Sequence, residues 1–398
     1  MTKIDSLIGR FLPNAIELRH EIHAHPEEAY AERETSRRVC ERLRRVKGLS
    51  IREGVAGTGI VATLGSDRPG PCIALRADMD ALPVQEESGA PYASARPGFM
   101  HACGHDGHVA CLVGAAAVLA EVADELHGPV VFLFQPAEEK GGGAARMCAE
   151  GSLDGPKVDA AFALHGWPAL DIGRVAVAPG VVFAANASLR ILIHGKGTHG
   201  AAPQTGVDPI LIGSHVVAAL QSIVARSLDP VQGGVVSVTT FHSGTTWNVI
   251  PPAATLTGTI RALSDEVLQD IGRRIREIAT GVAAGLGGRA EVEIASNYPV
   301  LRNHPKALAV FTEVAGRVLA SGALDANYPP RMVSEDFGYY AQRVPTTFWF
   351  LGVRPPGARD FPTLHHPEFD FPDEAAPLGI RLHCELALQF ARLWPARA

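Results

Sequence analysis

The sequence MHACGHDGHVACLVGAAAVLAEVADELHGPVVFLFQPAEE occupies residues 100–139 and carries the clearest indication of the architecture. It opens with a glycine-containing loop that holds three histidines, a cysteine and an aspartate. The apolar segment 108–126 then predicts a helix, and VVFLF (130–134) predicts a buried strand. Continuous apolar strands that alternate with helices are typical of an α/β layer fold with a mostly parallel sheet.

The sequence on both sides of this stretch continues the same alternation. Helices are predicted over 14–23, 30–47, 142–151, about 305–320 and about 373–394, and strands over 60–65, 72–77, 159–166 and 347–353. These elements predict one α/β domain with flanking helices.

The stretch 186–296 has a different rhythm, with longer strands and two long helices. The strands are NASLRILIHG, VVSVTTFHSG, ATLTGTIRAL and RAEVEIAS, and the helices are predicted over 208–228 and 264–286. The resulting order, β-α-β-β-α-β, is that of a ferredoxin-like α+β unit. We therefore expect three segments: 1–184, an inserted domain over 185–297, and 298–398, which completes the first domain.

Composition narrows the class of protein. The chain has 398 residues, which suits two domains, with 46% hydrophobic and 20% charged residues. The net charge is -6 and no lysine or arginine block occurs, so nucleic acid is not an expected partner. Six cysteines form no CxxC pair, which predicts reduced thiols. No membrane helix or signal peptide is expected, so the sequence predicts a cytoplasmic protein.

Residues suited to metal binding follow several predicted strands. Thiolate and imidazole groups, which Cys103 and its neighbouring histidines supply, favour zinc and similar ions. Glu138 and Glu139 follow VVFLF directly, and adjacent side chains diverge, so one can bind metal while the other faces a substrate. Without the other motifs, the two glutamates would be interpreted as solvated charges in a turn, with Lys140 as their partner.

Three further segments contain residues suited to a metal site. His165 ends a predicted strand, and His365 lies in a loop rich in proline and aromatic residues. Asp78 and Asp80 follow a third strand, and one of them is expected to orient a metal-bound histidine. An α/β sheet can gather all these side chains at one edge.

The motifs match a known group in combination. They are ALRADMDALPVQE (74–86), MHACGHDGH (100–108), FQPAEEKGGGA (134–144), ALHGWP (163–168), NVIP (248–251), GTIR (258–261), SEDF (334–337) and LHHPEFDF (364–371). From about Leu18 to Leu378 the chain resembles the dinuclear metal amidohydrolases, which include hippurate hydrolases, bacterial N-acyl amino acid hydrolases and plant indole-acetyl-amino-acid hydrolases. These enzymes are relatives of aminoacylases and carboxypeptidases. The resemblance implies a catalytic domain interrupted by a dimerisation domain.

The resemblance also implies roles for individual residues. Two divalent ions, Zn, Mn, Co or Ni, would be bridged by Cys103. The remaining ligands would be His105, Glu139, His165 and His365. Glu138 would be the general base, with Asp80 supporting the site. The carboxylates of SEDF are left outside the site, as candidate structural partners.

In the inserted segment the resemblance implies three substrate contacts. His199 would polarise the scissile carbonyl from the partner subunit, while Asn248 and Arg261 would bind the substrate carbonyl or carboxylate. The alternatives are a loop histidine, a turn asparagine and a surface arginine. Gln204 departs from the histidine common in the family, which puts the contacts of this loop in question.

The sequence therefore predicts a metal-dependent hydrolase of N-acyl amino acids such as hippurate, acting as a homodimer or a dimer of dimers. A dipeptidase or an N-acetyl-diaminopimelate deacetylase remains an alternative with the same mechanism. A metal-binding protein without catalysis is a third hypothesis, although it has no need of a base such as Glu138 beside the ligands. A purely structural oligomerisation protein leaves the five metal-type ligands unexplained.

Overall fold

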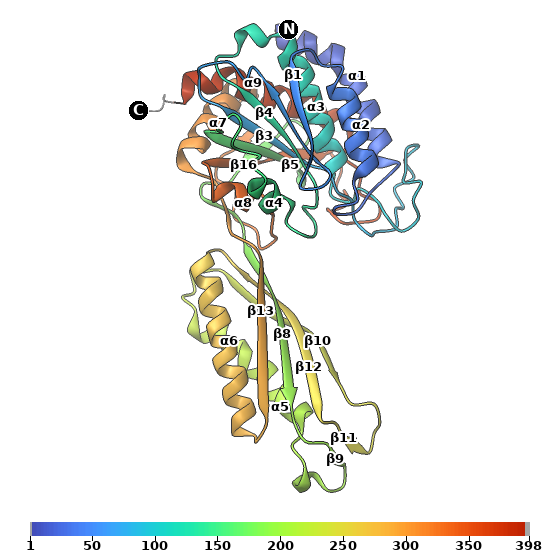
Figure 1. The fold of residues 1–398 in the computed structure, drawn as a ribbon, viewed down its shortest axis with the longest axis vertical. Coiled ribbons are helices and arrows are strands. Elements are labelled where there is room, and N and C mark those ends of the chain that lie inside the picture. Colours follow the sequence, from blue (N-terminus) through green and yellow to red (C-terminus); the bar gives the residue numbers. More distant parts are fainter. Residues whose placement is uncertain (1, 395–398) are drawn as a thin grey trace. The chain divides into compact units, whose positions relative to one another are not determined.

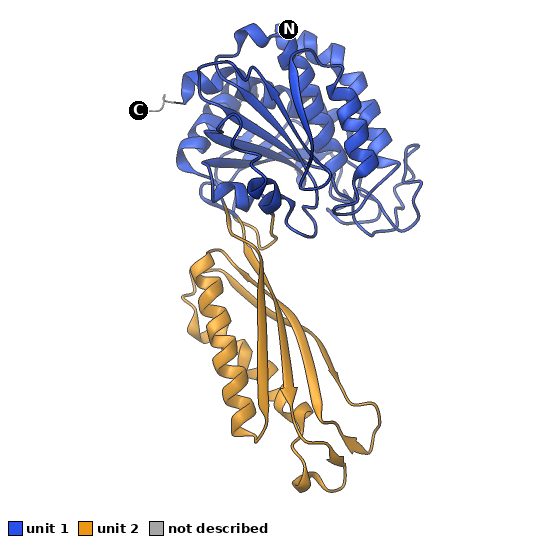
Figure 2. Ribbon diagram, viewed as in Figure 1, with its two compact units in different colours: residues 1–182, 302–329, 336–398 blue, residues 183–301, 330–335 orange. Residues whose placement is uncertain are grey.

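The computed structural model describes residues 2–394, which form two compact units (Figure 2). Unit 1 extends to Val182, resumes over Arg302–Pro329 and continues from Asp336. Unit 2 comprises Phe183–Leu301 and Pro330–Glu335.

An eight-stranded sheet forms the centre of unit 1 within the described residues (Figure 1). Its order is β1 (Leu49–Val55), β2 (Gly59–Leu64), β4 (Val130–Gln135), β3 (Ile73–Asp78), β5 (Ala160–Asp171), β16 (Thr346–Arg354), β6 (Val175–Val177) and β15 (Leu324–Asp325). The central strands β4, β3, β5 and β16 are parallel, while β1, β2 and β6 pair antiparallel with their inner neighbours. This mixed α/β layer with a mostly parallel sheet confirms the predicted fold class.

Five long helices share one hydrophobic core with this sheet. They are α1 (Lys3–His23), α2 (Arg33–Leu43), α3 (His105–Glu121), α7 (Pro305–Val318) and α9 (Ala376–Leu393). Because α3 is buried along almost its whole length, it is apolar on every side. The short helices α4 (Gly143–Ala149) and α8 (Gly338–Ala341) lie in the same unit.

Several element boundaries differ from the sequence-based prediction, among them those of α2, which was predicted over 30–47. Helix α1 begins at Lys3 because Thr2 and Asp5 cap each other's main-chain N–H groups. Helix α3 begins at His105, so the end of the histidine cluster forms its first turn instead of a loop. Strand β1 was missed, as were the short strands β6, β15 and the pair β7 (Val181–Phe183) and β14 (Leu301–Arg302). Strands of two or three residues are too short to show periodicity.

Unit 2 has its elements in the predicted β-α-β-β-α-β order (Figure 1). They are β8 (Ala185–His194), α5 (Pro209–Ser222), β10 (Gly234–Ser243), β12 (Ala253–Ala262), α6 (Asp265–Gly285) and β13 (Arg289–Tyr298). The strands form an antiparallel sheet in the order β10-β12-β8-β13, and its buried side chains pack against both helices. At one end, β9 (Thr198–His199) pairs with β11 (Val249–Ile250).

One segment of unit 2 departs from the expectation that the sequence holds no candidate membrane helix. Pro209–Ser227 spans 19 residues with a mean hydropathy of 1.4, enough to cross a membrane by length and composition. Its inner side chains, Ile212, Val216 and Leu220, are buried in the core of unit 2, whereas Ile210 and Leu211 are exposed. A single helix of this kind is weak evidence for a membrane span, since helices of soluble proteins pass the same test.

Candidate metal centre

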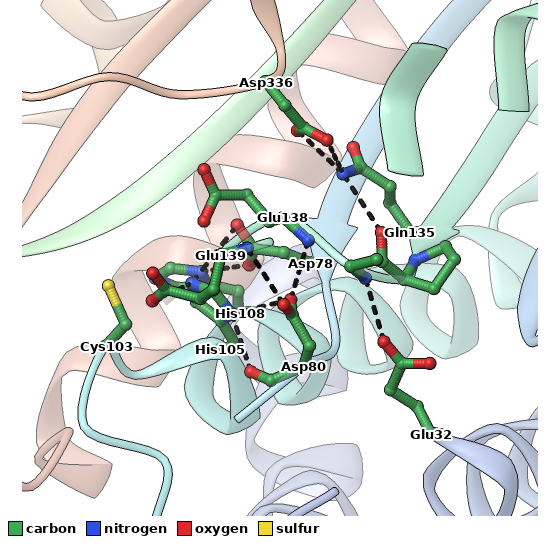
Figure 3. Close-up of polar contacts among 12 residues, drawn as sticks. Glu32, Asp78, Asp80, Cys103, His105, His108, Gln135, Glu138, Glu139 and Asp336 are labelled. Carbon is green, nitrogen blue, oxygen red and sulfur yellow. Dashed lines mark hydrogen bonds and ion pairs between the residues drawn. The ribbon is translucent and has the colours of Figure 1, made fainter. Parts of the chain in front are cut away.

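The parallel strands of unit 1 position the predicted site. Strand β3 ends at Asp78, β4 leads directly into the turn with Glu138 and Glu139, and His165 lies on β5. Cys103 precedes α3, and His105 opens it. These segments converge in a buried cluster (Figure 3).

Ligand-type atoms gather in two groups that share Cys103. One group is Cys103, His105 and His165, and the other is Cys103, Glu139 and His365; within each, the ligand atoms lie within 4.8 Å of one another. The Cys103 Sγ is 3.5 Å from His165 Nε2, and Glu139 Oε1 is 3.3 Å from His365 Nε2. The structure thus brings together the side chains of all five predicted ligands. Glu138 joins His105 and Glu139 in a further group.

Hydrogen bonds at the Nδ1 atoms prepare two histidines for metal binding. His105 Nδ1 donates to the main-chain carbonyl of Asp80 at 2.9 Å, and His165 Nδ1 donates to that of Gly166 at 2.8 Å. A proton fixed on Nδ1 leaves a lone pair on Nε2, which is the usual metal-binding arrangement. The Nε2 of His105 is buried without a hydrogen-bond partner, so these residues fit a divalent cation.

The charges of the cluster also favour a cation. Burial raises the pKa of the Cys103 thiol well above its usual value, and the carboxylates of Glu139 and Glu138 raise it further. Burial alone would lower the pKa of His105, but Asp78, Asp80 and Glu139 raise it to about 10. The carboxylates that contribute to both shifts give the cluster an excess of negative charge, which positive metal ions would offset while holding the thiolate form.

Asp80 contacts both the turn that carries the two glutamates and the His105 ring. Its carboxylate accepts the main-chain N–H groups of Glu138 at 3.0 Å and Glu139 at 2.9 Å, so it orients the turn (Figure 3). The short contact with His105 comes from the Asp80 carbonyl, while the carboxylate oxygen lies 3.4 Å from His105 Nδ1.

His108 has no role among the residues predicted from the sequence, but both of its ring nitrogens have partners. Its Nδ1 donates to Asp78 Oδ1 at 2.6 Å, and its Nε2 accepts the N–H of Gly166 at 2.9 Å. His108 also lies in a ligand-type group with Asp78 and His105, but both of its ring nitrogens are engaged by these hydrogen bonds, one of which orients the residue after His165. His101 is buried and lies in none of the ligand groups found among the described residues.

A buried ion network that shares Asp78 with the cluster was also missed. Arg76 donates to Asp78 at 2.5 Å and to Asp336 at 3.1 Å, and Asp336 also accepts from Gln135 and the Ala144 N–H. Asp336, part of the SEDF motif, is therefore a structural partner. The sequence did contain one indication of this network, because Arg76 interrupts an apolar predicted strand and a buried charge needs a partner.

The three predicted substrate contacts of unit 2 lie at opposite ends of its sheet. His199 pairs with Val249, and the carbonyl of Asn248 accepts the Gly200 N–H at 2.8 Å, which places both residues at the β9–β11 end. Arg261 pairs with Asn186 at the other end of β12. Arg261 lies eight positions after Ala253 on this strand, roughly 25 Å at the usual rise of an extended chain. The structure therefore does not bring Asn248 and Arg261 of one chain together.

Comparisons with known proteins agree with this geometry. Residues 74–389 match the sequence model of peptidase family M20/M25/M40. The chain is 38% identical to an N-acetyl-L-cysteine deacetylase of Bacillus subtilis over 91% of its length and 84% of that protein's. It is also 38% identical to IAA-amino acid hydrolase ILR1-like 4 of Arabidopsis thaliana, over 94% of this chain and 84% of that one. A dinuclear metal-binding peptidase of the M20 family from Bacillus subtilis superposes with a TM-score of 0.83 at 34% identity, covering 96% of this chain and 99% of the other.

Proposed function

The chain belongs to peptidase family M20/M25/M40 and is a metal-dependent amidohydrolase, and from this membership we propose that it hydrolyses N-acyl amino acids. The products are a carboxylic acid and a free amino acid. We expect hippurate-like compounds to be the preferred substrates. The observation that best supports this proposal is that two groups of ligand atoms share Cys103, with the buried carboxyl of Glu138 beside them. A dipeptidase or an N-acetyl-diaminopimelate deacetylase is the alternative.

In this proposal two divalent ions, Zn, Mn, Co or Ni, would be held by the residues of these two groups, and Cys103 would be the ligand that they share. His105, Glu139, His165 and His365 complete the ligand set, and the two groups that share Cys103 support this assignment. Metal ions bound there supply Lewis acidity toward the scissile carbonyl and the attacking water.

Glu138 is the general base of the proposed reaction. Its carboxylate takes a proton from the attacking water and delivers it to the nitrogen of the leaving amine. Asp80 holds the backbone of both glutamates, so the Glu138 side chain keeps its direction during the two transfers. The side chain is only 6% exposed, which keeps bulk water away from the proton it carries.

The function is tested by assaying the purified protein with hippurate, other N-acyl amino acids, dipeptides and N-acetyl-diaminopimelate, each with Zn, Mn, Co and Ni. Metal-dependent release of a free amino acid from N-acyl amino acids, with the highest kcat/KM among the four classes, is the expected result. Higher kcat/KM for dipeptides or for N-acetyl-diaminopimelate would move the assignment to the alternative.

Arg261 is the proposed partner of the substrate carboxylate. It is half-buried, and burial lowers the pKa of its guanidinium. Burial is the only cause of this shift, and no carboxylate contributes to it, so a planar, bidentate donor is available to a bound acid. The first residues of β8 pair with this end of β12, which places Arg261 near the start of unit 2.

Free acids should therefore be far better substrates than their amides. Converting the α-carboxylate of hippurate to an amide removes the partner of Arg261, and a charge-assisted contact contributes about 1.5–3 kcal/mol. We expect kcat/KM to fall by about 10- to 100-fold, as such an energy implies. In Arg261→Ala the difference between acid and amide should nearly vanish. Equal kcat/KM values for both substrates of the unmodified protein would remove the carboxylate from the proposed recognition.

Unit 2 is the proposed dimerisation domain. It covers Phe183–Leu301, where the sequence predicts the inserted domain 185–297. Strand β10 is an edge of its sheet, and exposed apolar side chains, Ile210, Leu211, Val224 and Phe241, lie on α5, the turn after it and β10. An unpaired edge beside apolar surface favours pairing with a second copy. The assembly would be a homodimer or a dimer of dimers.

His199 is proposed to act in the partner subunit's active site, together with Asn248. Both residues lie at the β9–β11 end of unit 2, far from the end that holds Arg261. A substrate bound by all three would need residues from two chains. The exposed His199 ring would donate a hydrogen bond to the oxygen that becomes negative during attack. Gln204 lies in the exposed turn Pro203–Thr205 close to it in sequence.

Complementation tests this arrangement. Losing one such donor costs about 10²–10³ in kcat, so His199→Ala and Glu138→Gln homodimers should each be nearly inactive. A mixed dimer holds one site with both defects and one with neither. After subunit exchange of an equal mixture, half the dimers are mixed, so activity should approach about a quarter of wild type. If exchange is verified and no activity returns, His199 does not act across the interface.

We also propose a cytoplasmic location without nucleic-acid or membrane partners. All six cysteines lie within the described residues, and none of them forms a disulfide bond there. Free thiols persist in reducing compartments, which supports this location.

A further inference from the structure

Glu32 is a buried acid at the start of α2 that lies outside the proposed ligands and base. Its side chain is fully shielded from solvent. One carboxyl oxygen, Oε1, accepts the main-chain N–H groups of Tyr30 at 3.0 Å and Ala137 at 2.9 Å. The other, Oε2, accepts the Thr58 hydroxyl at 2.5 Å. Glu32 thus ties the start of α2 to the turn that follows β4 (Figure 3).

That turn carries the proposed base and one proposed ligand. The N–H groups of three consecutive residues, 137, 138 and 139, all point at carboxyl oxygens. Asp80 takes the second and third, and Glu32 takes the first. Glu32 and Asp80 together therefore accept the N–H groups of the whole backbone segment that carries Glu138.

The backbone of Ala137 needs such a constraint. Its φ of 56° lies in the left-handed region, which costs a non-glycine residue free energy and persists only where the surroundings enforce it. The Ala137 carbonyl accepts the Gly143 N–H at 3.1 Å, which closes the turn. With its N–H released from Glu32, Ala137 would relax toward ordinary φ values and rotate the next residue, Glu138.

We propose that Glu32 is a positioning residue, which fixes the direction of the Glu138 carboxyl by holding the Ala137 N–H. This inference rests on the proposed role of Glu138 as general base. Glu32 itself touches neither substrate nor metal ligands in this role. Its effect on the reaction passes through the backbone of the turn.

The hydrogen bonds, and not the negative charge, are what the turn requires. Burial raises the pKa of Glu32 to about 7, against the lowering by the Thr58 hydroxyl, so the neutral acid is accessible near neutral pH. A glutamine has the same shape and keeps an acceptor oxygen for Tyr30 and Ala137, while its amide can donate to the Thr58 oxygen. Glu32→Gln should therefore preserve the position of Glu138, and Glu32→Ala should not.

The experiment measures kcat and KM for hippurate, metal content and thermal stability. In Glu32→Ala we expect kcat to fall by about 10- to 100-fold, since a misplacement of about 1 Å costs up to that much. KM should stay within about threefold and metal content should stay full, because no ligand or substrate contact is lost. Glu32→Gln should recover most of kcat. Glu32→Asp keeps the charge but has a side chain shorter by one methylene, so its kcat should fall as in Glu32→Ala. It replaces the alanine variant in the experiment if that variant does not fold.

A matched control separates positioning from general stability. Glu27 is also an acid that accepts main-chain N–H groups at the start of α2, from Glu34 at 3.2 Å and Thr35 at 2.8 Å, but it does not bond the turn. Glu27→Ala should lower stability and leave kcat near wild type. An unchanged kcat in Glu32→Ala and Glu32→Asp, or no recovery in Glu32→Gln, would overturn the proposal.

Hydrogen exchange gives a readout that does not need turnover. The main-chain amides of residues 137–139 should exchange faster in Glu32→Ala than in wild type, and at wild-type rates in Glu32→Gln and Glu27→Ala. If the wild-type protein cleaved none of the tested substrates, the proposed function would fail, while exchange would still decide whether Glu32 holds the turn. Unchanged exchange in Glu32→Ala would overturn the inference by itself.

Discussion

Glu138→Gln should retain its metals and substrate affinity and lose nearly all turnover. Glutamine matches the shape of Glu138 but cannot take a proton from water. A general base contributes about 10²–10⁴-fold, and a base acting on water at a metal centre should lie near the upper limit. Because Asp80 holds the backbone of this residue and not its carboxyl, the substitution should leave the turn intact. Single-turnover kinetics, metal analysis and thermal unfolding of the same preparation measure these three effects.

Glu139→Gln is the matched comparison, since it removes the adjacent carboxylate with the same isosteric change. Glu139 lies 3.3 Å from His365 and 3.9 Å from His105, so this variant should lose metal. Its activity should recover in part at high metal concentration, whereas that of Glu138→Gln should not. Metal loss in Glu138→Gln together with full metal content in Glu139→Gln would reverse the two roles.

Cys103→Ala should abolish activity and deplete both metal positions. Cys103 is the shared member of the two ligand groups, so its loss affects both sets at once. Alanine supplies no ligand atom, and the remaining buried carboxylates would repel one another without a cation. Metal analysis of the purified variant, followed by titration with Zn or Mn, measures the change in occupancy and affinity.

The control for this variant is Cys40→Ala, which removes another buried thiol in the same unit. Cys40 packs in the core on α2 and belongs to none of the ligand groups, so its loss should reduce stability only. Full metal content with normal activity in Cys103→Ala would exclude the bridging role. Loss of only one ion would restrict Cys103 to a single metal.

Much of the fold was predictable because buried helices and strands have apolar residues in local patterns that the sequence shows directly. The run VVFLF and the apolar segment after Gly107 are buried on all sides, and both were predicted from their hydrophobicity. The resemblance to metal amidohydrolases rested on short motifs and is confirmed by family membership. The five ligand assignments and the catalytic roles stay predictions, although the structure brings the ligand side chains together.

Other features depend on contacts between segments that are distant in sequence. By itself, the sequence determined the layered α/β architecture, the order of elements in unit 2 and the residue types of a metal centre, since these follow from local patterning and motif chemistry. Only the tertiary structure distinguished His105 from His108, because their roles depend on which ring nitrogens find partners. It alone placed Arg261 and Asn248 at opposite ends of unit 2 and joined Glu32 to Ala137 across 105 positions. Hydrogen bonds are directional and short-ranged, so such partners exist only once the chain has folded.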